Sequence, residues 1–281
     1  MYPVVKRRDL ADNIVLLEVQ APEVAAKALP GEFVIVRVNE QAERIPLTVM
    51  DFNREKGTIT IVIQEVGYSS AVINSLKEGD SFLDFVGPLG VPTEIENYGR
   101  VVCVAGGLGA APVFPIARAL KEAGNEVISI IGARSKDLII LEEEMAAVSD
   151  KLLLATNDGS AGVQGFVTDA LAKVLEETDG KVDHVWAIGP MIMMKAVCDF
   201  TRDKGIKTIV SMNPIMVDGT GMCGACRISV GGETKFACVD GPEFDGHLVD
   251  FNLAMKRLAY FKEEEKRAMA RLNCGGGCGC H

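Results

Sequence analysis

Residues 101–112 read Val-Val-Cys-Val-Ala-Gly-Gly-Leu-Gly-Ala-Ala-Pro, an apolar run that ends in a glycine-rich turn. The apolar run predicts a buried strand, and proline is well tolerated in the first turn of a helix. A glycine-rich turn between a buried strand and a helix is the setting that a dinucleotide-binding loop requires. The turn departs from Gly-x-Gly-x-x-Gly because Pro112 replaces the third glycine. An ordinary strand-to-helix turn therefore stays open as the alternative.

The segment around this turn alternates between strand and helix patterns. Helical stretches such as 112–123 and 138–148 separate short apolar runs at 101–105, 126–131, 151–156, 185–188 and 208–211. This alternation predicts a doubly wound parallel-sheet α/β domain, which we assign to residues 99–212. Gly189 and Pro190 end a later strand in the same way, at the edge where a nicotinamide would lie.

The first part of the chain has a β pattern. Short runs rich in Val and Ile lie at 13–20, 31–38, 58–65 and 81–86, and turn residues separate them. A turn or two of helix is expected after Gly67. Several short strands at this spacing favour a small β-barrel, which we assign to residues 1–98.

Two short motifs in this barrel have the composition of a phosphate and ring site. Arg44-Ile-Pro46-Leu47-Thr48 offers a guanidinium that can donate paired hydrogen bonds to a diphosphate, an extended segment and a hydroxyl. Gly67-Tyr-Ser-Ser70 opens the expected helix with free backbone N–H groups. Each motif alone is weak, because a surface arginine and an ordinary helix cap would explain them almost as well.

Six of the eight cysteines follow residue 220 and define the next segment. Asp218, Cys223, Cys226 and Cys238 have the spacing Asp-x4-Cys-x2-Cys-x11-Cys. With cysteine in place of the aspartate, this is the spacing of plant-type [2Fe-2S] loops. A carboxylate has the charge of a thiolate and can ligate ferric iron through oxygen. We therefore assign a [2Fe-2S] module to residues 213–246.

Alternatives to this cluster are a zinc ribbon and a free Cys-x-x-Cys thiol pair. Zinc usually needs two Cys-x-x-Cys knuckles or added histidines, and the segment has neither. A thiolate from elsewhere in the chain is the alternative to Asp218 as fourth ligand.

Residues 247–281 are expected to form a C-terminal helix, at about 250–272, and a cysteine-rich tail. The tail carries three thiols and an imidazole on a glycine-rich tether, in Cys274, Cys278, Cys280 and His281. These side chains suit a metal site, but a tail with free thiols explains them equally well.

The composition excludes several classes of partner. A formal net charge of −10 over 281 residues argues against nucleic acid and against an anionic membrane surface. No apolar run approaches the roughly 20 residues that span a bilayer, and the first residues lack a signal-peptide pattern. Clustered cysteines in such a chain point to metal or redox chemistry. We expect a cytoplasmic protein with no membrane and no nucleic-acid partner.

Taken in this order, the motifs resemble the ferredoxin-NADP reductase superfamily. The cysteine loop is similar to that of the electron-transfer subunit of dihydroorotate dehydrogenase, which has cysteine at the position of Asp218. The aspartate form looks closer to the small subunit of NADH-dependent ferredoxin:NADP oxidoreductase, also described as a sulfide dehydrogenase subunit. The tail from Cys274 has no counterpart in the family pattern.

This resemblance implies a role for each matching position. Arg44 would contact the diphosphate of FAD, and Gly67 and Ser70 would help to hold its phosphates. Thr48, the candidate catalytic residue, would hydrogen-bond near flavin N5. The other implied residues shape the flavin pocket (Pro46, Leu47), the nicotinamide nucleotide site (Gly107, Gly109, Pro112, Gly189, Pro190, Met194) or ligate the cluster (Asp218, Cys223, Cys226, Cys238).

The implied function is electron transfer by an NAD(P)H-dependent oxidoreductase subunit. Hydride would pass between NAD(H) or NADP(H) and FAD, and single electrons between FAD and the [2Fe-2S] cluster. The implied partner is a larger subunit with flavin and [4Fe-4S] clusters, whose flavin bifurcates electrons and which reaches ferredoxin. The alternatives are a subunit of a dihydroorotate or sulfide dehydrogenase, and a non-catalytic cluster-binding wiring module. Arg134-Ser135 suits a 2′-phosphate but is also ordinary at a strand end, so the choice between NAD and NADP stays open.

Overall fold

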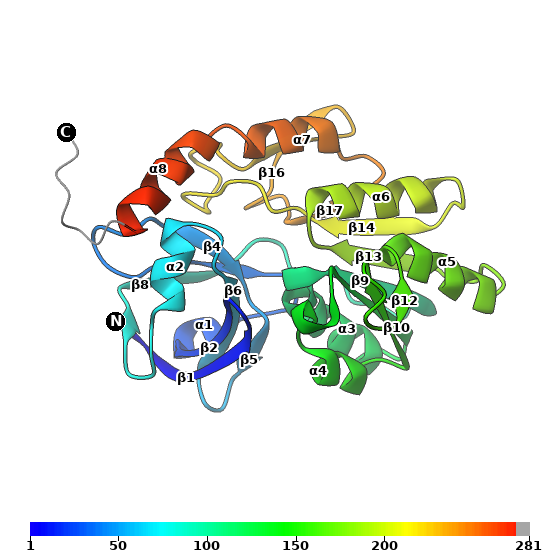
Figure 1. Cartoon of the computed structure of the whole chain (residues 1–281), viewed down its shortest axis with the longest axis horizontal. Helices are drawn as coiled ribbons and strands as arrows, with labels where there is room; N and C mark the ends of the chain where they lie inside the picture. Colours follow the sequence, from blue (N-terminus) through cyan, green and yellow to red (C-terminus); the bar gives the residue numbers. More distant parts are fainter. Residues whose placement is uncertain (274–281) are drawn as a thin grey trace.

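A computed structural model describes residues 1–273, and it has three parts (Figure 1). A β-barrel comes first and a helix-covered sheet follows. A cysteine-containing segment and two C-terminal helices then lie over both. The predicted fold class, a barrel joined to a parallel-sheet α/β domain, is confirmed.

The barrel combines two antiparallel sheets, with strand orders β5-β6-β2-β1-β7 and β4-β3-β8. Its elements are β1 (Tyr2–Ala11), β2 (Ile14–Gln20), α1 (Pro22–Ala25), β3 (Phe33–Arg37), β4 (Ile45–Thr48), β5 (Asp51–Asn53), β6 (Thr58–Gln64), α2 (Tyr68–Asn74), β7 (Ser81–Phe82) and β8 (Asp84–Leu89). The chain crosses from one sheet to the other between β2 and β3, between β4 and β5 and between β7 and β8, so the two sheets enclose one apolar core. The sequence patterns did not predict β1, because its run Lys6-Arg7-Arg8-Asp9 is charged and pairing with β2 defines the strand.

The second domain is a seven-stranded sheet in the order β12-β11-β10-β9-β13-β14-β17, parallel except for the edge strand β17. Its strands are β9 (Arg100–Gly106), β10 (Glu126–Ala133), β11 (Lys151–Thr156), β12 (Val163–Gln164), β13 (His184–Ile188), β14 (Lys207–Ser211) and β17 (Glu243–Asp245). Its helices are η1 (Gly107–Gly109), α3 (Ala110–Glu122), η2 (Lys136–Leu138), α4 (Glu142–Ala147), α5 (Val167–Glu177) and α6 (Met191–Arg202).

Helices cover both faces of this sheet. On one face, α5 and α6 pack with α7 (Phe251–Leu258) over alternate strand residues such as Val102 and Val104. On the other face, α3 and α4 cover Val101 and Cys103, and this core continues into barrel residues such as Leu16. The barrel and the sheet therefore share buried apolar contacts, and Arg118 of α3 adds an ion pair to Asp51 of β5 at 2.7 Å.

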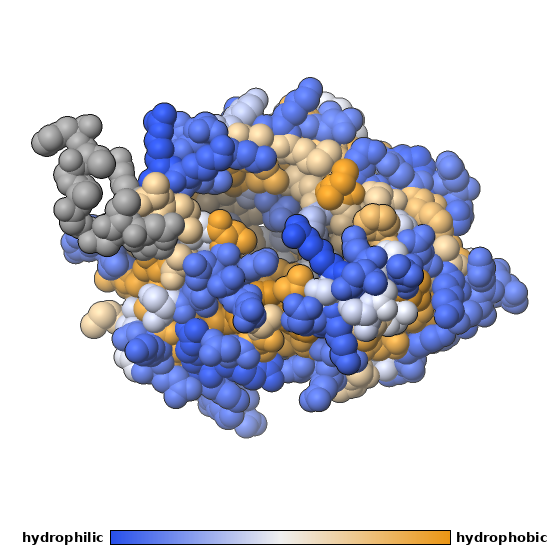
Figure 2. Space-filling view, viewed as in Figure 1, coloured by the Kyte–Doolittle hydropathy of each residue, from blue (hydrophilic) through white to orange (hydrophobic). Residues whose placement is uncertain are grey.

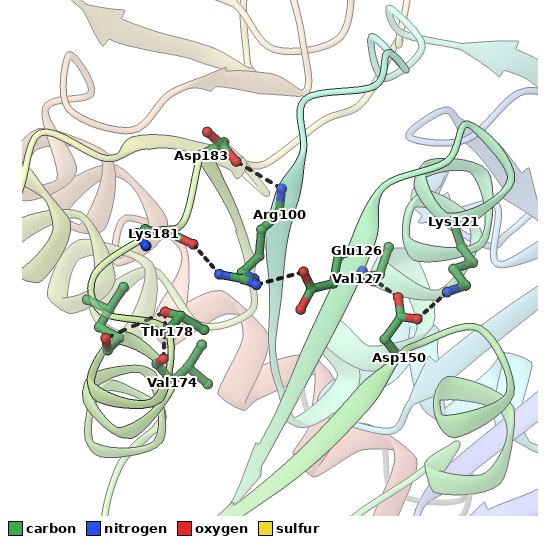
Figure 3. Close-up of polar contacts among 10 residues, drawn as sticks. Arg100, Lys121, Glu126, Val127, Asp150, Val174, Thr178, Lys181 and Asp183 are labelled. Atoms are coloured by element: carbon green, nitrogen blue, oxygen red, sulfur yellow. Dashed lines mark hydrogen bonds and ion pairs between the residues drawn. The ribbon is translucent and has the colours of Figure 1, made fainter.

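Polar contacts tie down the amino edge of the sheet (Figure 3). The backbone N–H of Arg100 donates to Asp183 Oδ2 at 2.9 Å, and its guanidinium pairs with Glu126 at 2.9 Å. Asp150 accepts the Val127 N–H at 2.9 Å and pairs with Lys121. These contacts link the starts of β9, β10, β11 and β13. The opposite, carboxyl edge is left free to build a site.

The cysteine-containing segment follows β14 and returns to the sheet. It holds one hairpin, β15 (Arg227–Val230) and β16 (Glu233–Phe236), and its end forms β17, which pairs antiparallel with β14. The pattern predicted as one helix breaks between α7 and α8 (Lys262–Asn273), and α8 packs against α2 of the barrel. No helix within residues 1–273 is long and apolar enough to cross a membrane.

Candidate functional site

A cleft of about 1170 Å³ runs between the barrel and the carboxyl edge of the parallel sheet. Figure 2 shows the hollow on this face of the molecule. Eight of the residues predicted from sequence line it: Pro46, Leu47, Thr48, Gly107, Gly109, Pro112, Gly189 and Pro190. The barrel motif and both glycine motifs, which are far apart in the sequence, therefore face one space. Its volume is somewhat above the usual range for small-molecule sites, about 300–1,000 Å³, so the cleft has room for more than one drug-sized ligand.

The glycine-rich turn after β9 fits tightly against the end of β13. A Cβ placed on Gly109 would lie 2.0 Å from the backbone oxygen of Ile188, so only glycine allows this approach. Gly189 lies beside Gly106 in the same contact. The contact brings the two loops together at the carboxyl edge, where nucleotides bind in doubly wound sheets.

Met194 does not line this cleft. Its side chain has no exposed surface and packs in the core between α6 and the sheet. Its neighbour Met193 lines the cleft instead, with its sulfur against Gly106. One residue along a helix turns a side chain by about 100°, which separates a core position from a site position.

Arg44 lies just outside the residues that line the cleft, next to the start of β4. By strand alternation it shares a face with Pro46 and Thr48. Its guanidinium is 3.9 Å from Asp84 Oδ2, and that carboxylate is held more closely by Arg37 at 2.6 Å. Arg44 is therefore only loosely paired and is partly exposed.

The Gly67–Ser70 turn is close to Arg44. Ser69 Oγ donates to Glu43 Oε2 at 2.5 Å, which ties the start of α2 to the residue before Arg44. Ser70 Oγ accepts the N–H groups of Val66 and Gly67, both at 2.9 Å, and donates to the Gly67 carbonyl. The Ser70 hydroxyl thus shapes the turn, while Gly67 faces open space.

The cleft also has polar residues that the sequence patterns did not single out. Asn13 and Gln64 reach it from the barrel, and Asn157 from the end of β11. Arg134, noted only for a 2′-phosphate, lines it from the end of β10. The signal that would have found Asn157 is its place directly after a buried strand, at the edge that β9 and β13 share.

Two of the four predicted ligands, Cys226 of the cysteine loop (residues 218–226) and Cys238, lie in contact with each other. Cys226 and Cys238 are both 2% exposed, and their Sγ atoms are 3.2 Å apart. Burial raises the pKa of Cys238 to about 11. Cys223 is exposed, and the N–H groups of Ala225 and Asp218 lower its pKa by favouring the thiolate.

Asp218 lies at the start of the same loop. The Thr220 hydroxyl and then the Thr220 and Met222 N–H groups lower the pKa of Asp218, and the Arg44 charge adds to this. Each iron of a [2Fe-2S] cluster takes two protein ligands, so two pairs suit it. In the predicted ligand set, Cys226 with Cys238, and Asp218 with Cys223, would supply such pairs. Within residues 1–273, no three His, Cys, Asp or Glu side chains lie close enough together to hold one metal ion.

The buried side of the cysteine loop packs on the outside of the barrel. Cys226 and Cys238 share an apolar cluster with Phe33 and Ile35 of β3 and with Met216. A Cβ on Gly219 would lie 2.9 Å from side-chain carbons of Ile35 and Leu89, which shows how close the loop comes. The remaining candidates, Cys274, Cys278, Cys280 and His281, lie outside the described residues.

A barrel that meets the carboxyl edge of a parallel sheet across one cleft defines a nicotinamide-nucleotide oxidoreductase of the ferredoxin-reductase type. Two family models agree with this class. Residues 103–199 match the oxidoreductase NAD-binding domain, and residues 213–250 match the iron-sulfur cluster binding domain of dihydroorotate dehydrogenase B.

Relatives extend the match to nearly the whole chain. The dihydroorotate dehydrogenase B (NAD(+)) electron transfer subunit homolog of Thermotoga maritima is 50% identical over 95% of this chain and 94% of its own length. The dihydroorotate dehydrogenase B (NAD(+)) electron transfer subunit of Geobacillus thermodenitrificans is 33% identical, over 86% of this chain and 94% of its own length. The chain belongs to the family of dihydroorotate dehydrogenase B electron-transfer subunits and their homologues. It is an NAD(P)H-dependent oxidoreductase subunit with an iron–sulfur domain.

A solved structure gives a similar result. A chain from the NADH-dependent reduced ferredoxin-NADP oxidoreductase, described as a flavin-based electron-bifurcating enzyme, is 49% identical. It superposes with a TM-score of 0.92 over 97% of this chain and 98% of its own length. The match includes the barrel, the sheet and the cysteine segment together.

Proposed function

We propose that this chain is the small electron-transfer subunit of an electron-bifurcating, NADH-dependent ferredoxin:NADP oxidoreductase. In this role it exchanges hydride with NAD(H) and passes single electrons to a partner subunit. The observation that carries the proposal is the single cleft that joins the barrel motif to both nucleotide loops and reaches the side chains packed on Cys226 and Cys238. The full-length likeness to the bifurcating enzyme supports the same assignment.

FAD, bound in the barrel half of the cleft, supplies the conversion between a two-electron hydride donor and a one-electron cluster. In our proposal Arg44 binds its diphosphate, because the guanidinium is only loosely paired and can form charge-assisted hydrogen bonds. Gly67 leaves room for the phosphates, and Ser70 supports that turn from behind. Pro46 and Leu47 shape the wall of the ring pocket.

Thr48 ends β4 and is the one hydroxyl residue of the barrel motif. Thr48 lines the same cleft as the loops that end β9 and β13. We assign it to hydrogen-bond the reactive edge of the flavin, which orients the ring for hydride exchange. Gly107, Gly109 and Pro112, with Gly189 and Pro190, bind and orient the nicotinamide nucleotide, and Met193 packs beneath them.

The partner in this proposal is a larger subunit with its own flavin and [4Fe-4S] clusters, which reaches ferredoxin. Exposed apolar side chains around the cysteine loop support docking there: Met222 is 87% exposed, Val217 49% and Val239 42%. Exposed apolar side chains that gather beside a functional site are typical of protein interfaces. Clustered thiols need a reducing compartment, so the proposal places the complex in the cytoplasm.

Cofactor content and partial reactions of the anaerobically purified chain test the proposal. We expect about one FAD, two irons and two acid-labile sulfides per chain. NADH should bleach the flavin and then reduce the cluster, and the Arg44→Ala variant should lose most of its FAD. Zinc without sulfide, or full FAD retention in Arg44→Ala, would contradict these assignments. A parallel titration with NADPH decides between the two nucleotides.

The identity of the partner subunit distinguishes this function from the alternative functions. Purification of the native complex should bring down a larger flavin and [4Fe-4S] subunit, and NADPH oxidation should depend on both ferredoxin and NAD. A partner that oxidises dihydroorotate would instead indicate that the chain is a dihydroorotate dehydrogenase subunit, like its 33% identical relative. A chain with no diaphorase activity would be a wiring module rather than an enzyme subunit.

A further inference from the structure

The wall between the cleft and the cysteine loop is thin. Phe33 lines the cleft and also packs with Cys226 and Cys238 in one apolar cluster. Met216, which precedes Asp218 by two positions, does both as well. Both side chains are nearly buried, with 3% of Phe33 and 6% of Met216 exposed. These two side chains, here called the partition, therefore touch both candidate cofactor sites.

Strand geometry places the partition directly behind the barrel motif. Phe33 pairs with Thr48 across β3 and β4, and Ile35 pairs with Pro46. Cross-strand partners lie on the same face of a sheet, so this face carries both the flavin-pocket residues and the residues that touch the loop. The alternate residues Val34 and Val36 point the other way, into the barrel core.

We propose that Phe33 and Met216 are the positioning residues for electron transfer between the flavin site and the cluster. They keep the intervening space dry and closely packed at a thickness of one side chain. Packed atoms carry electronic coupling better than an empty or water-filled gap does. The inference rests on the proposed function, because it requires both cofactors.

The electron balance across the partition is simple. Hydride from NADH brings two electrons, and these cross one at a time. With both groups bound, each crossing would remove one electron from the reduced flavin and reduce one ferric iron to ferrous. The first electron would have to leave the cluster for the partner subunit before the second could cross, and the proton left by the hydride would go to solvent.

The test separates flavin reduction from cluster reduction in anaerobic stopped-flow mixing with NADH. Flavin bleaching is followed by absorbance, and cluster reduction by freeze-quench EPR. In Phe33→Ala, the rate of cluster reduction relative to the rate of flavin bleaching should fall by about tenfold because a cavity replaces packed atoms. Met216→Ala should slow the same phase. Potentials of both cofactors, measured by titration, should stay unchanged.

Val34→Ala is the matched control, since Val34 is on the same strand and fully buried but faces the barrel core. It should lower stability without changing the ratio of the two phases. Phe33→Leu and Met216→Leu, which keep apolar volume better, provide variants that fold if the alanine variants do not. They should give a smaller slowing of the same phase.

Two outcomes would overturn the inference and leave the proposed function standing. One is an unchanged cluster-reduction phase in partition variants that retain full FAD and iron. The other is an equal slowing in Val34→Ala. A wild-type chain without FAD or without a cluster would instead overturn the proposed function.

Discussion

Asp218 shows how one residue sets the chemistry of the cysteine loop. It takes the place of a thiolate in the plant-type spacing, and its carboxylate is held by the Thr220 hydroxyl and backbone N–H groups. Arg44, the proposed diphosphate ligand, is close enough to influence the pKa of Asp218. The same arginine therefore affects both candidate cofactor sites.

The first prediction concerns this ligand. Asp218→Cys should keep a [2Fe-2S] cluster, because thiolate has the same charge, but its optical spectrum and potential should shift since sulfur is the softer donor. Asp218→Ala should lose most of the cluster, as measured by iron and sulfide content. Cys274→Ser, Cys278→Ser and Cys280→Ser are the controls and should keep the cluster. Loss of the EPR signal in one of these controls, with a normal signal in Asp218→Ala, would move the fourth ligand to the tail.

At the scale of elements, the turn between β9 and α3 depends on what packs against it. Gly107 has a φ of +53° and no neighbour within 4 Å of an added Cβ, so glycine is favoured there by the local backbone conformation. Gly109 has an ordinary helical φ, and glycine is needed there because the end of β13 leaves no room for a Cβ. The two positions in one motif therefore need glycine for different physical reasons.

The second prediction compares these two glycines. Gly109→Ala should push the turn away from Ile188, which should weaken NADH binding by at least about tenfold and lower stability by about 2 kcal/mol or more. Gly107→Ala should cost only about 1 kcal/mol, the strain of a left-handed backbone. Calorimetry of NADH binding and thermal unfolding measure both effects. Equal losses in the two variants would show that the contact with β13 is not decisive.

On the scale of the whole molecule, Glu243 joins all three parts. It lies on β17, at the end of the cysteine-containing segment, and its Oε1 accepts a hydrogen bond from the Thr93 hydroxyl, at the end of the barrel domain, at 2.8 Å. Trp186 of β13 lies beside it, and the indole N–H favours the carboxylate without forming a well-aligned hydrogen bond. Enclosure of the carboxyl group outweighs both contacts and raises the pKa of Glu243 to about 7.

The third prediction is a pH dependence of stability. Between the unfolded pKa of 4.5 and about 7, the folded chain holds a proton that the unfolded chain has released. The contribution of Glu243 to the free energy of unfolding should therefore be greatest below pH 4.5. It should fall by at most about 3 kcal/mol as the pH rises to 7. Glu243→Gln, which cannot titrate, should remove this decline and be the more stable protein at pH 8.

Thermal unfolding of the anaerobic holoprotein at pH 5, 6, 7 and 8 measures this difference. Glu233→Gln is the control, because Glu233 is an exposed acid on the β15–β16 hairpin paired with Lys235. It should follow the wild-type pH profile. A Glu243→Gln profile parallel to wild type would show that the carboxyl titrates in the same range in both states.

Local patterns were sufficient for much of this protein. The run at 101–112 defined a buried strand, a glycine turn and a helix, and β9, η1 and α3 lie there. The alternation of strand and helix patterns after it correctly predicted the parallel sheet. The cysteine spacing correctly predicted the iron–sulfur segment. These features are encoded by neighbours in the chain, because side-chain periodicity and turn residues record which face is buried and where the chain turns.

Tertiary structure alone decided which buried faces meet. The strand pattern showed that Phe33 and Ile35 are apolar, but not that they leave the barrel core to pack on Cys226 and Cys238. The glycine motif did not distinguish Met193 from Met194, and the charged β1 became a strand only by pairing with β2. β17 returns from the cysteine segment to the edge of the nucleotide sheet. The reason is physical. The polarity of each residue indicates whether it is buried, but which surface it packs against depends on contacts between segments far apart in the chain.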